Sequence, residues 1–170
     1  MFDFPSRFLL VGSNNRGHCE KPASLVSQVK PYFDPESIEN YEKRSHEIQK
    51  PGTGWTYTMK ERSPFSIVYL GYPGTGHQPT FEKMLCEFFT EVDKICLRGG
   101  DSDITMPLVG TSSRGLSLGK WAESFNRVAK YYTETHKYTL INTLTIVCTN
   151  QTKKEIIDRK IPPSYFNFRL

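Results

Sequence analysis

The stretch from residue 103 to residue 132 constrains the fold most, because it has the pattern of a strand, a tight loop and a helix in immediate succession. Residues 103–109 form a short apolar run with β-branched side chains, typical of a buried strand, and Pro107 suits the end of that strand. Ser117 is the expected N-cap of the helix. The apolar residues that recur at helical spacing after it are Leu118, Trp121, Ala122, Phe125, Val128, Ala129 and Tyr132.

The loop between this strand and helix runs Gly110-Thr-Ser-Ser-Arg-Gly-Leu116. Glycines on both sides of small hydroxyl residues at a helix start allow several backbone N–H groups to point at one anion. No Gly-Lys-Ser/Thr ends the loop, so it is not a P-loop. Ser112 stands where the dinucleotide fingerprint has its middle glycine. Two interpretations remain open, a phosphate-binding loop and a Gly/Ser-rich turn with a purely geometric role.

The rest of the chain alternates between strand and helix patterns. Further strands are expected over residues 7–12, 55–60, 65–71 and 140–148, and helices over 21–33, 80–98 and 152–160. A polar helix that begins at Asp34-Pro35 has Ile38, Tyr41 and Ile48 to bury. This alternation predicts an α/β fold, a three-layer α/β/α sandwich with a mixed, largely parallel central sheet.

In such sheets ligands bind beyond the carboxyl ends of the strands, where this sequence has polar loops. The Gly71-to-His77 loop is glycine-rich, although Pro73 and the lack of a lysine also fit a simple turn that carries Tyr72. The candidate ligand-binding residues at the four strand ends are Gly12, Ser13, Asn14, Asn15, Gly71, Tyr72, Gly110, Thr111, Ser112, Ser113, Arg114, Gly115, Leu116, Thr149 and Asn150.

Composition indicates one globular domain over residues 1–170, with a core at about 7–160 and an aromatic tail at 161–170 that covers the domain or meets a partner. A net charge of +4 favours an anionic ligand but is too small and too scattered for specific nucleic-acid binding. No apolar run is long enough for a membrane span, and a cytoplasmic location is expected. The scattered cysteines, Cys19, Cys86, Cys96 and Cys148, indicate buried free thiols, with no metal or cofactor.

At this point the chain resembles a macro domain, the α/β/α module that binds ADP-ribose and related nucleotides. Residues 104–116 are similar to that family's phosphate-binding loop, Pro-x-x-Gly-Thr-Gly-x-x-Gly. Residues 51–57 and 65–73 resemble its middle section, and residues 8–15 stand where the family has a strand that ends in Asn-Ala-Ala-Asn. The resemblance implies a binding module for ADP-ribose or a related NAD-derived nucleotide, with the pyrophosphate held by the 110–116 loop and Arg114.

The departures from the family pattern concern catalysis. Its hydrolase branches use an acidic or lysine residue near the distal ribose, and neither the 12–17 loop nor the 110–117 loop contains one. We therefore expect a binder. As an alternative, the protein is an ADP-ribosyl hydrolase or ADP-ribose phosphatase in which Asn14, Asn15 and His18 place a water, although a lone histidine is more often structural. A third alternative is a ligand-free protein-interaction module.

The sequence predicts slow or no hydrolysis of ADP-ribosylated protein and of ADP-ribose 1″-phosphate by micromolar protein. Any residual activity should depend on His18 and should fall below pH ~6.5, where an unperturbed histidine becomes protonated and stops acting as a base. Product release measured for the wild type and for His18→Ala checks this. Rapid release that survives in His18→Ala would contradict both the preference for binding and the choice of base.

Overall fold

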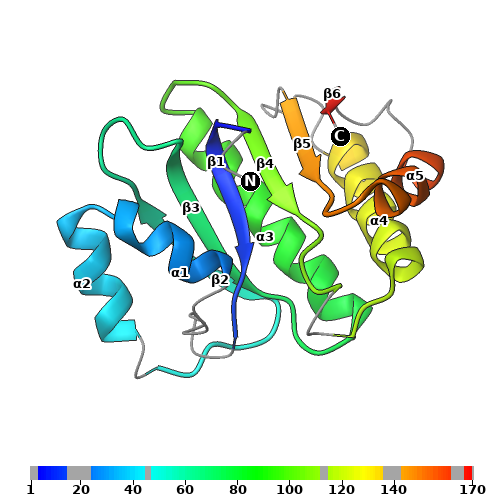
Figure 1. Ribbon diagram of the computed structural model, residues 1–170, viewed down its shortest axis with the longest axis horizontal. Helices are drawn as coiled ribbons and strands as arrows, with labels where there is room; N and C mark the ends of the chain where they lie inside the picture. The colour runs from blue at the N-terminus through cyan, green and yellow to red at the C-terminus, as the bar shows by residue number, and fades with distance from the viewer. Residues whose placement is uncertain are drawn as a thin grey trace.

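A computed structural model describes residues 4–14, 24–44, 47–111, 115–135, 143–161 and 167–169. Its centre is a six-stranded sheet in the order β2-β3-β1-β4-β5-β6 (Figure 1). Every neighbouring pair is parallel except β2 and β3, which are antiparallel. The strands are β1 (Ser6–Gly12), β2 (Thr53–Thr58), β3 (Phe65–Tyr72), β4 (Asp103–Pro107), β5 (Thr143–Val147) and β6 (Asn167–Arg169).

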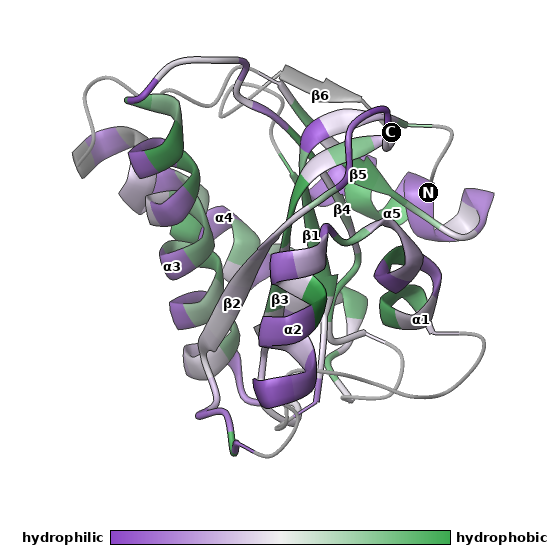
Figure 2. Cartoon of the chain, turned by 90° about the vertical axis from the view of Figure 1, so that its left-hand side faces the viewer, coloured by the Kyte–Doolittle hydropathy of each residue, from purple (hydrophilic) through white to green (hydrophobic). Residues whose placement is uncertain are grey.

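Helices cover both faces of this sheet, which confirms the expected three-layer α/β/α sandwich. The helices are α1 (Leu25–Val29), the 3₁₀ turn η1 (Lys30–Tyr32), α2 (Pro35–Arg44), α3 (Gln78–Cys96), α4 (Leu118–Thr135) and α5 (Gln151–Lys160). One face packs against α1 and α2, and the other against α3, α4 and α5 (Figure 1). Figure 2 shows the hydrophobic residues of α3 turned toward the sheet.

The central strand β1 divides the hydrophobic core into two parts. Phe8 and Leu10 point into the larger part, between the sheet and α3 with α4, whereas Leu9 and Val11 point into the smaller part under α1 and α2. All four are at most 2% exposed. A parallel strand covered on both faces needs a continuous run of apolar residues, because the side chains on both of its faces are buried.

The expected caps at two helix starts are present. The Asp34 carboxylate accepts a hydrogen bond from the Ser37 N–H at 2.7 Å, and the Ser117 hydroxyl oxygen accepts one from the Lys120 N–H at 3.2 Å. Each bond satisfies an amide that the helix itself leaves unpaired. Pro107 is the last residue of β4, which therefore ends two residues before the predicted end at Val109.

The structure differs from the sequence-based expectation at three further places. The expected 21–33 helix is, in its described part, the short α1 followed by η1, because Pro31 has no N–H to continue an α-helix. Ile48 is 79% exposed, so its expected burial is wrong: α2 ends at Arg44, four residues earlier. The tail contains β6, which pairs with β5 and extends the sheet.

The strand order also fixes where a ligand site belongs. After β1 the chain forms β2 and β3 on one side of β1. It then crosses to the other side of β1 to form β4 and continues outward to β5. The switch in direction therefore lies between β1 and β4. In open α/β sheets the loops that leave the two strands at this switch point form the binding crevice.

We predict that Ser37→Ala destabilises the fold by roughly 1–3 kcal/mol, the usual cost of an unsatisfied buried polar group. The Ser37 side chain is buried, and its hydroxyl oxygen accepts a hydrogen bond at 2.8 Å from the Thr58 N–H, which joins α2 to β2. The exposed Glu39→Ala, on the same helix, is the control. Urea unfolding should show a lower midpoint for Ser37→Ala alone. Equal midpoints for the two variants would contradict the role of this bond.

Candidate functional site

The loops that follow β1 and β4 are in direct contact at the switch point. A Cβ built on Gly12 would lie only 3.0 Å from Cγ1 of Val109, so the lack of a side chain at Gly12 lets the Val109 side chain pack against its backbone. The Ser13 N–H donates to the Gly71 carbonyl at 2.8 Å, which ties the first loop to the end of β3. Three of the four strand ends expected to share a ligand are thus linked through Gly12, Ser13, Gly71 and Val109.

The central loop, residues 110–116, needs glycine at both of its ends. Gly110 has φ +87° and Gly115 has φ +75°, the left-handed region that other residues rarely adopt. The Leu116 N–H donates to the Gly110 carbonyl at 3.0 Å and closes the loop. The Leu116 side chain is buried in the larger core, where it anchors the loop. Leu116 thus supports the loop with both its amide and its side chain.

The N-terminus of α4 gives this loop a positive electrostatic character. The 18-residue helix begins at Leu118, directly after the loop, and has no acidic residue in its first turn. Within the part of the chain that the structure describes, no group accepts the N–H of Gly110 or of Gly115. Free amides next to the positive end of a helix dipole attract an anion such as a phosphate.

The loop after β3 packs against the central loop from the other side. A Cβ on Gly110 would lie 3.7 Å from Cγ of Pro73. The Thr80 hydroxyl donates to the Pro73 carbonyl at 2.9 Å and fixes this loop to α3. Tyr72, which is half-buried, accepts the Gly52 N–H on its carbonyl at 2.7 Å. The Pro73 loop therefore forms a wall of the site.

The end of β5 has a different local role. The Asn150 side chain accepts a hydrogen bond from the Lys153 N–H at 2.9 Å and caps α5, while Thr149 is exposed. Cys148, just before them, is half-buried, and burial together with the nearby Asp158 raises the pKa of its thiol. The thiol is therefore protonated at neutral pH and unsuited to act as a nucleophile.

Of the predicted site residues, Gly12, Ser13 and Gly71 are linked in the structure, and Asn14 follows them on the first loop. Gly110 contacts the loop after β3 at Pro73. Thr111 turns its hydroxyl to the Leu108 carbonyl at 2.8 Å. The contacts between loops run through Val109 and Pro73, which sequence reasoning missed because neither has a polar side chain. Asn15, His18, Ser112, Ser113 and Arg114 lie outside the described residues.

The described ranges contain neither a cluster of metal-binding side chains nor a membrane-spanning helix. No group of three or more His, Cys, Asp or Glu side chains could hold a metal ion there. Among the same residues, no helix has the length and apolar character to cross a membrane.

Comparison with known proteins gives matches at the level of structure. No family model and no curated protein matches the sequence. The Trypanosoma brucei macrodomain in complex with ADP-ribose superposes with a TM-score of 0.70 at 13% identity over 93% of this chain. The same macrodomain with ADP gives 0.66 at 13% identity over 89%. A variant of the Oceanobacillus iheyensis macrodomain with ADPR gives 0.70 at 12% identity over 91%.

The chain spans 64% and 61% of the two T. brucei chains and 84% of the O. iheyensis chain. The match covers the sheet and both helical layers, although few residues are identical. This chain has the macrodomain fold.

Proposed function

We propose that this protein is a binding module for ADP-ribose or a related NAD-derived nucleotide, and that the 110–116 loop holds the diphosphate. The observation that carries the proposal is the pair of glycines with positive φ, Gly110 and Gly115, whose amides have no acceptor among the described residues and adjoin the start of α4. The nucleotides named for the structural neighbours, ADP and ADP-ribose, both contain a diphosphate, which supports this choice of ligand.

The loop suits a diphosphate for two physical reasons. Glycine has no Cβ, so a phosphate oxygen can approach the backbone closely at both ends of the loop. The N–H groups of Gly110 and Gly115 can then donate to the phosphate while the dipole of α4 stabilises its charge. In the proposal Arg114 adds a charge-assisted contact, and Ser112 and Ser113 add hydroxyl donors.

We assign the distal ribose of ADP-ribose to the first loop, which follows β1. This loop meets the central loop where Gly12 contacts Val109, so a ligand on the 110–116 loop has Ser13 and Asn14 beside it. An asparagine amide supplies both a donor and an acceptor, which suits a pair of ribose hydroxyls. Asn14 and Asn15 are therefore proposed to recognise the part of ADP-ribose that ADP lacks.

Binding is preferred to catalysis on the chemistry of these loops. Their described residues, 12–14, 108–111 and 115–117, contain no carboxylate to activate water. Cys148 is the thiol nearest to the strand ends in sequence, and burial keeps it protonated. The proposal therefore includes ADP-ribosylated protein as a partner that is recognised rather than cleaved.

We predict that Gly115→Val abolishes ADP-ribose binding, because a side chain at this position stands where the phosphate approaches. The change also costs roughly 1–2 kcal/mol of stability, since valine resists a positive φ. Gly99→Val is the matched control: Gly99 has φ +107° and, like Gly115, no neighbouring atom within 4 Å of a built Cβ. Calorimetry should find binding lost in Gly115→Val and kept in Gly99→Val. Binding that survives in both variants would disprove the loop assignment.

We also predict that replacing Asn14 and Asn15 by Ala weakens ADP-ribose binding much more than ADP binding. Loss of hydrogen bonds to ribose hydroxyls should cost about tenfold or more in affinity for ADP-ribose. Affinity for ADP should stay near the wild-type value, because ADP lacks the distal ribose. Titration calorimetry with both nucleotides measures the affinity for ADP-ribose and for ADP in the wild type and in the variant. Equal losses for the two ligands would move these asparagines away from the distal ribose.

A further inference from the structure

The outer edge of the sheet at β2 presents backbone groups that face away from β3. Hydrogen bonding alternates along an antiparallel pair, and the Met59 N–H donates to the Ser66 carbonyl at 2.9 Å. Trp55 and Tyr57 of β2 therefore turn their N–H and C=O groups toward β3. The even-numbered residues Gly54, Thr56 and Thr58 turn theirs outward.

Half of this outer edge is already paired. The Thr58 carbonyl accepts the Asp34 N–H at 3.0 Å, and the Thr58 N–H donates to the Ser37 hydroxyl at 2.8 Å. One step further along, the Lys60 N–H donates to the Tyr32 carbonyl at 2.7 Å. Residues 32–37, which include the first turn of α2, thus cover the edge from Thr58 onward.

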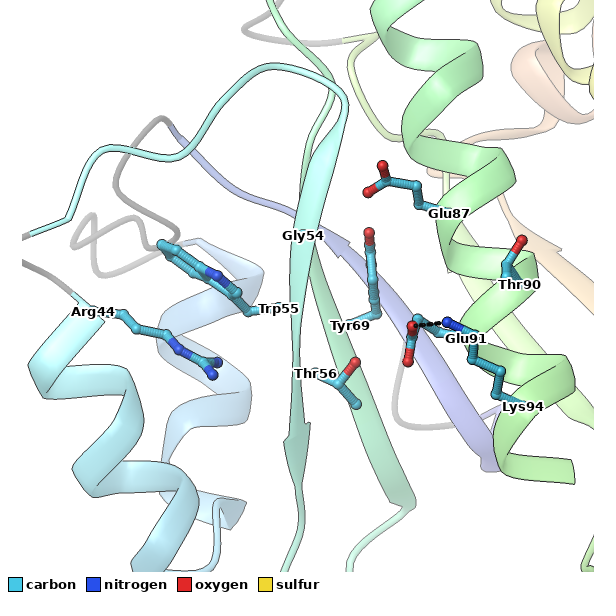
Figure 3. Close-up of a pocket in the computed structure, with 9 residues that line it drawn as sticks. All are labelled: Arg44, Gly54, Trp55, Thr56, Tyr69, Glu87, Thr90, Glu91 and Lys94. Carbon is cyan, nitrogen blue, oxygen red and sulfur yellow. Dashed lines mark hydrogen bonds and ion pairs between the residues drawn. The ribbon is translucent and has the colours of Figure 1, made fainter. Parts of the chain in front are cut away.

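The other half is open at Gly54 and Thr56. Among the described residues, none donates to or accepts from the backbone of these two. They lie in a hollow of about 500 Å³ that runs around the edge between α2 and α3 (Figure 3). An unpaired stretch of edge strand inside a hollow is a template for another strand.

The two sides of the hollow carry opposite charges. On one side the Arg44 guanidinium lies over the Trp55 ring, 5.3 Å from its centroid, and no described carboxylate forms an ion pair with it. On the other side Glu87, Glu91 and Lys94 project from α3, where the two carboxylates outnumber the one ammonium group (Figure 3). Lys83 and Lys94 lie 3.9 and 3.4 Å from Glu87 and Glu91 on an exposed surface, where such ion pairs contribute little free energy.

We propose that this edge binds an extended segment of a partner protein, which pairs with Gly54 and Thr56 as an additional strand. Side chains alternate between faces in a strand. The residue opposite Trp55 would point to the Arg44 side, and the residues opposite Gly54 and Thr56 would point to the Glu87 side. The charges on the two sides therefore select a carboxylate flanked by two cations, a Lys-Glu-Lys pattern. None of these residues belongs to the proposed nucleotide site.

The probe for this site is the capped peptide acetyl-Val-Lys-Glu-Lys-Val-amide, titrated into ¹⁵N-labelled protein. Binding should shift the amide resonances of Gly54 and Thr56 and slow their exchange with solvent, because both amides gain an acceptor. A peptide N-methylated at its two lysine amides keeps every side chain but loses the donors that face β2. Its affinity should fall about tenfold or more. Equal binding of the methylated peptide would overturn the strand pairing.

The charge pattern is tested with a second peptide and with protein variants. The reversed peptide, with Glu-Lys-Glu at its centre, should bind about tenfold more weakly than the first. Arg44→Gln should weaken binding of the first peptide, whereas Lys43→Gln, an exposed neighbour on the same helix, should not. Equal binding of the two peptides, or no binding of either, would overturn the proposal. These results do not depend on whether ADP-ribose binds.

Discussion

The rest of the structure depends on the parallel pairing of β1 with a neighbour on each side. β1 pairs along its whole length with β3, from Ser6 opposite Phe65 to Gly12 opposite Gly71, and it pairs with β4 through Phe8 and Leu9. Because β1 is buried on both faces, a shift of one residue would exchange its two core faces. The register therefore also fixes which loops meet beyond the strand ends, and the chemistry of those loops is a consequence of it.

Much of the fold could be predicted because it follows from local patterns. The long apolar stripes of α3 and α4 settle their type and their buried face, and the caps at Asp34 and Ser117 are short-range hydrogen bonds within one turn. The central loop is predictable for the same reason: glycines at Gly110 and Gly115 mark turns that other residues resist. The fold class then follows from the alternation of strands and helices.

The remaining features depend on partners that are distant in sequence. Nothing near Gly12 indicates that Val109 will touch it, and nothing near Asn150 distinguishes a helix cap from a ligand contact. The pairing of β6 with β5 joins the tail to the sheet edge, and this three-residue strand is too short for its period-two alternation to identify it. Such features are decided by the packing of the whole sheet, so local propensity cannot reveal them.

The cover over Thr58 has a consequence for how copies of this protein behave at high concentration. A sheet with a long bare edge can recruit the same edge of another copy, and such contacts can propagate into aggregates. Here residues 32–37 cover the edge from Thr58 onward and, among the described residues, leave Gly54 and Thr56 bare, between groups of opposite charge. So short an opening offers few backbone partners to the edge of a second copy. The Ser37 hydroxyl, which accepts the Thr58 N–H, therefore also shortens the edge that another copy could reach.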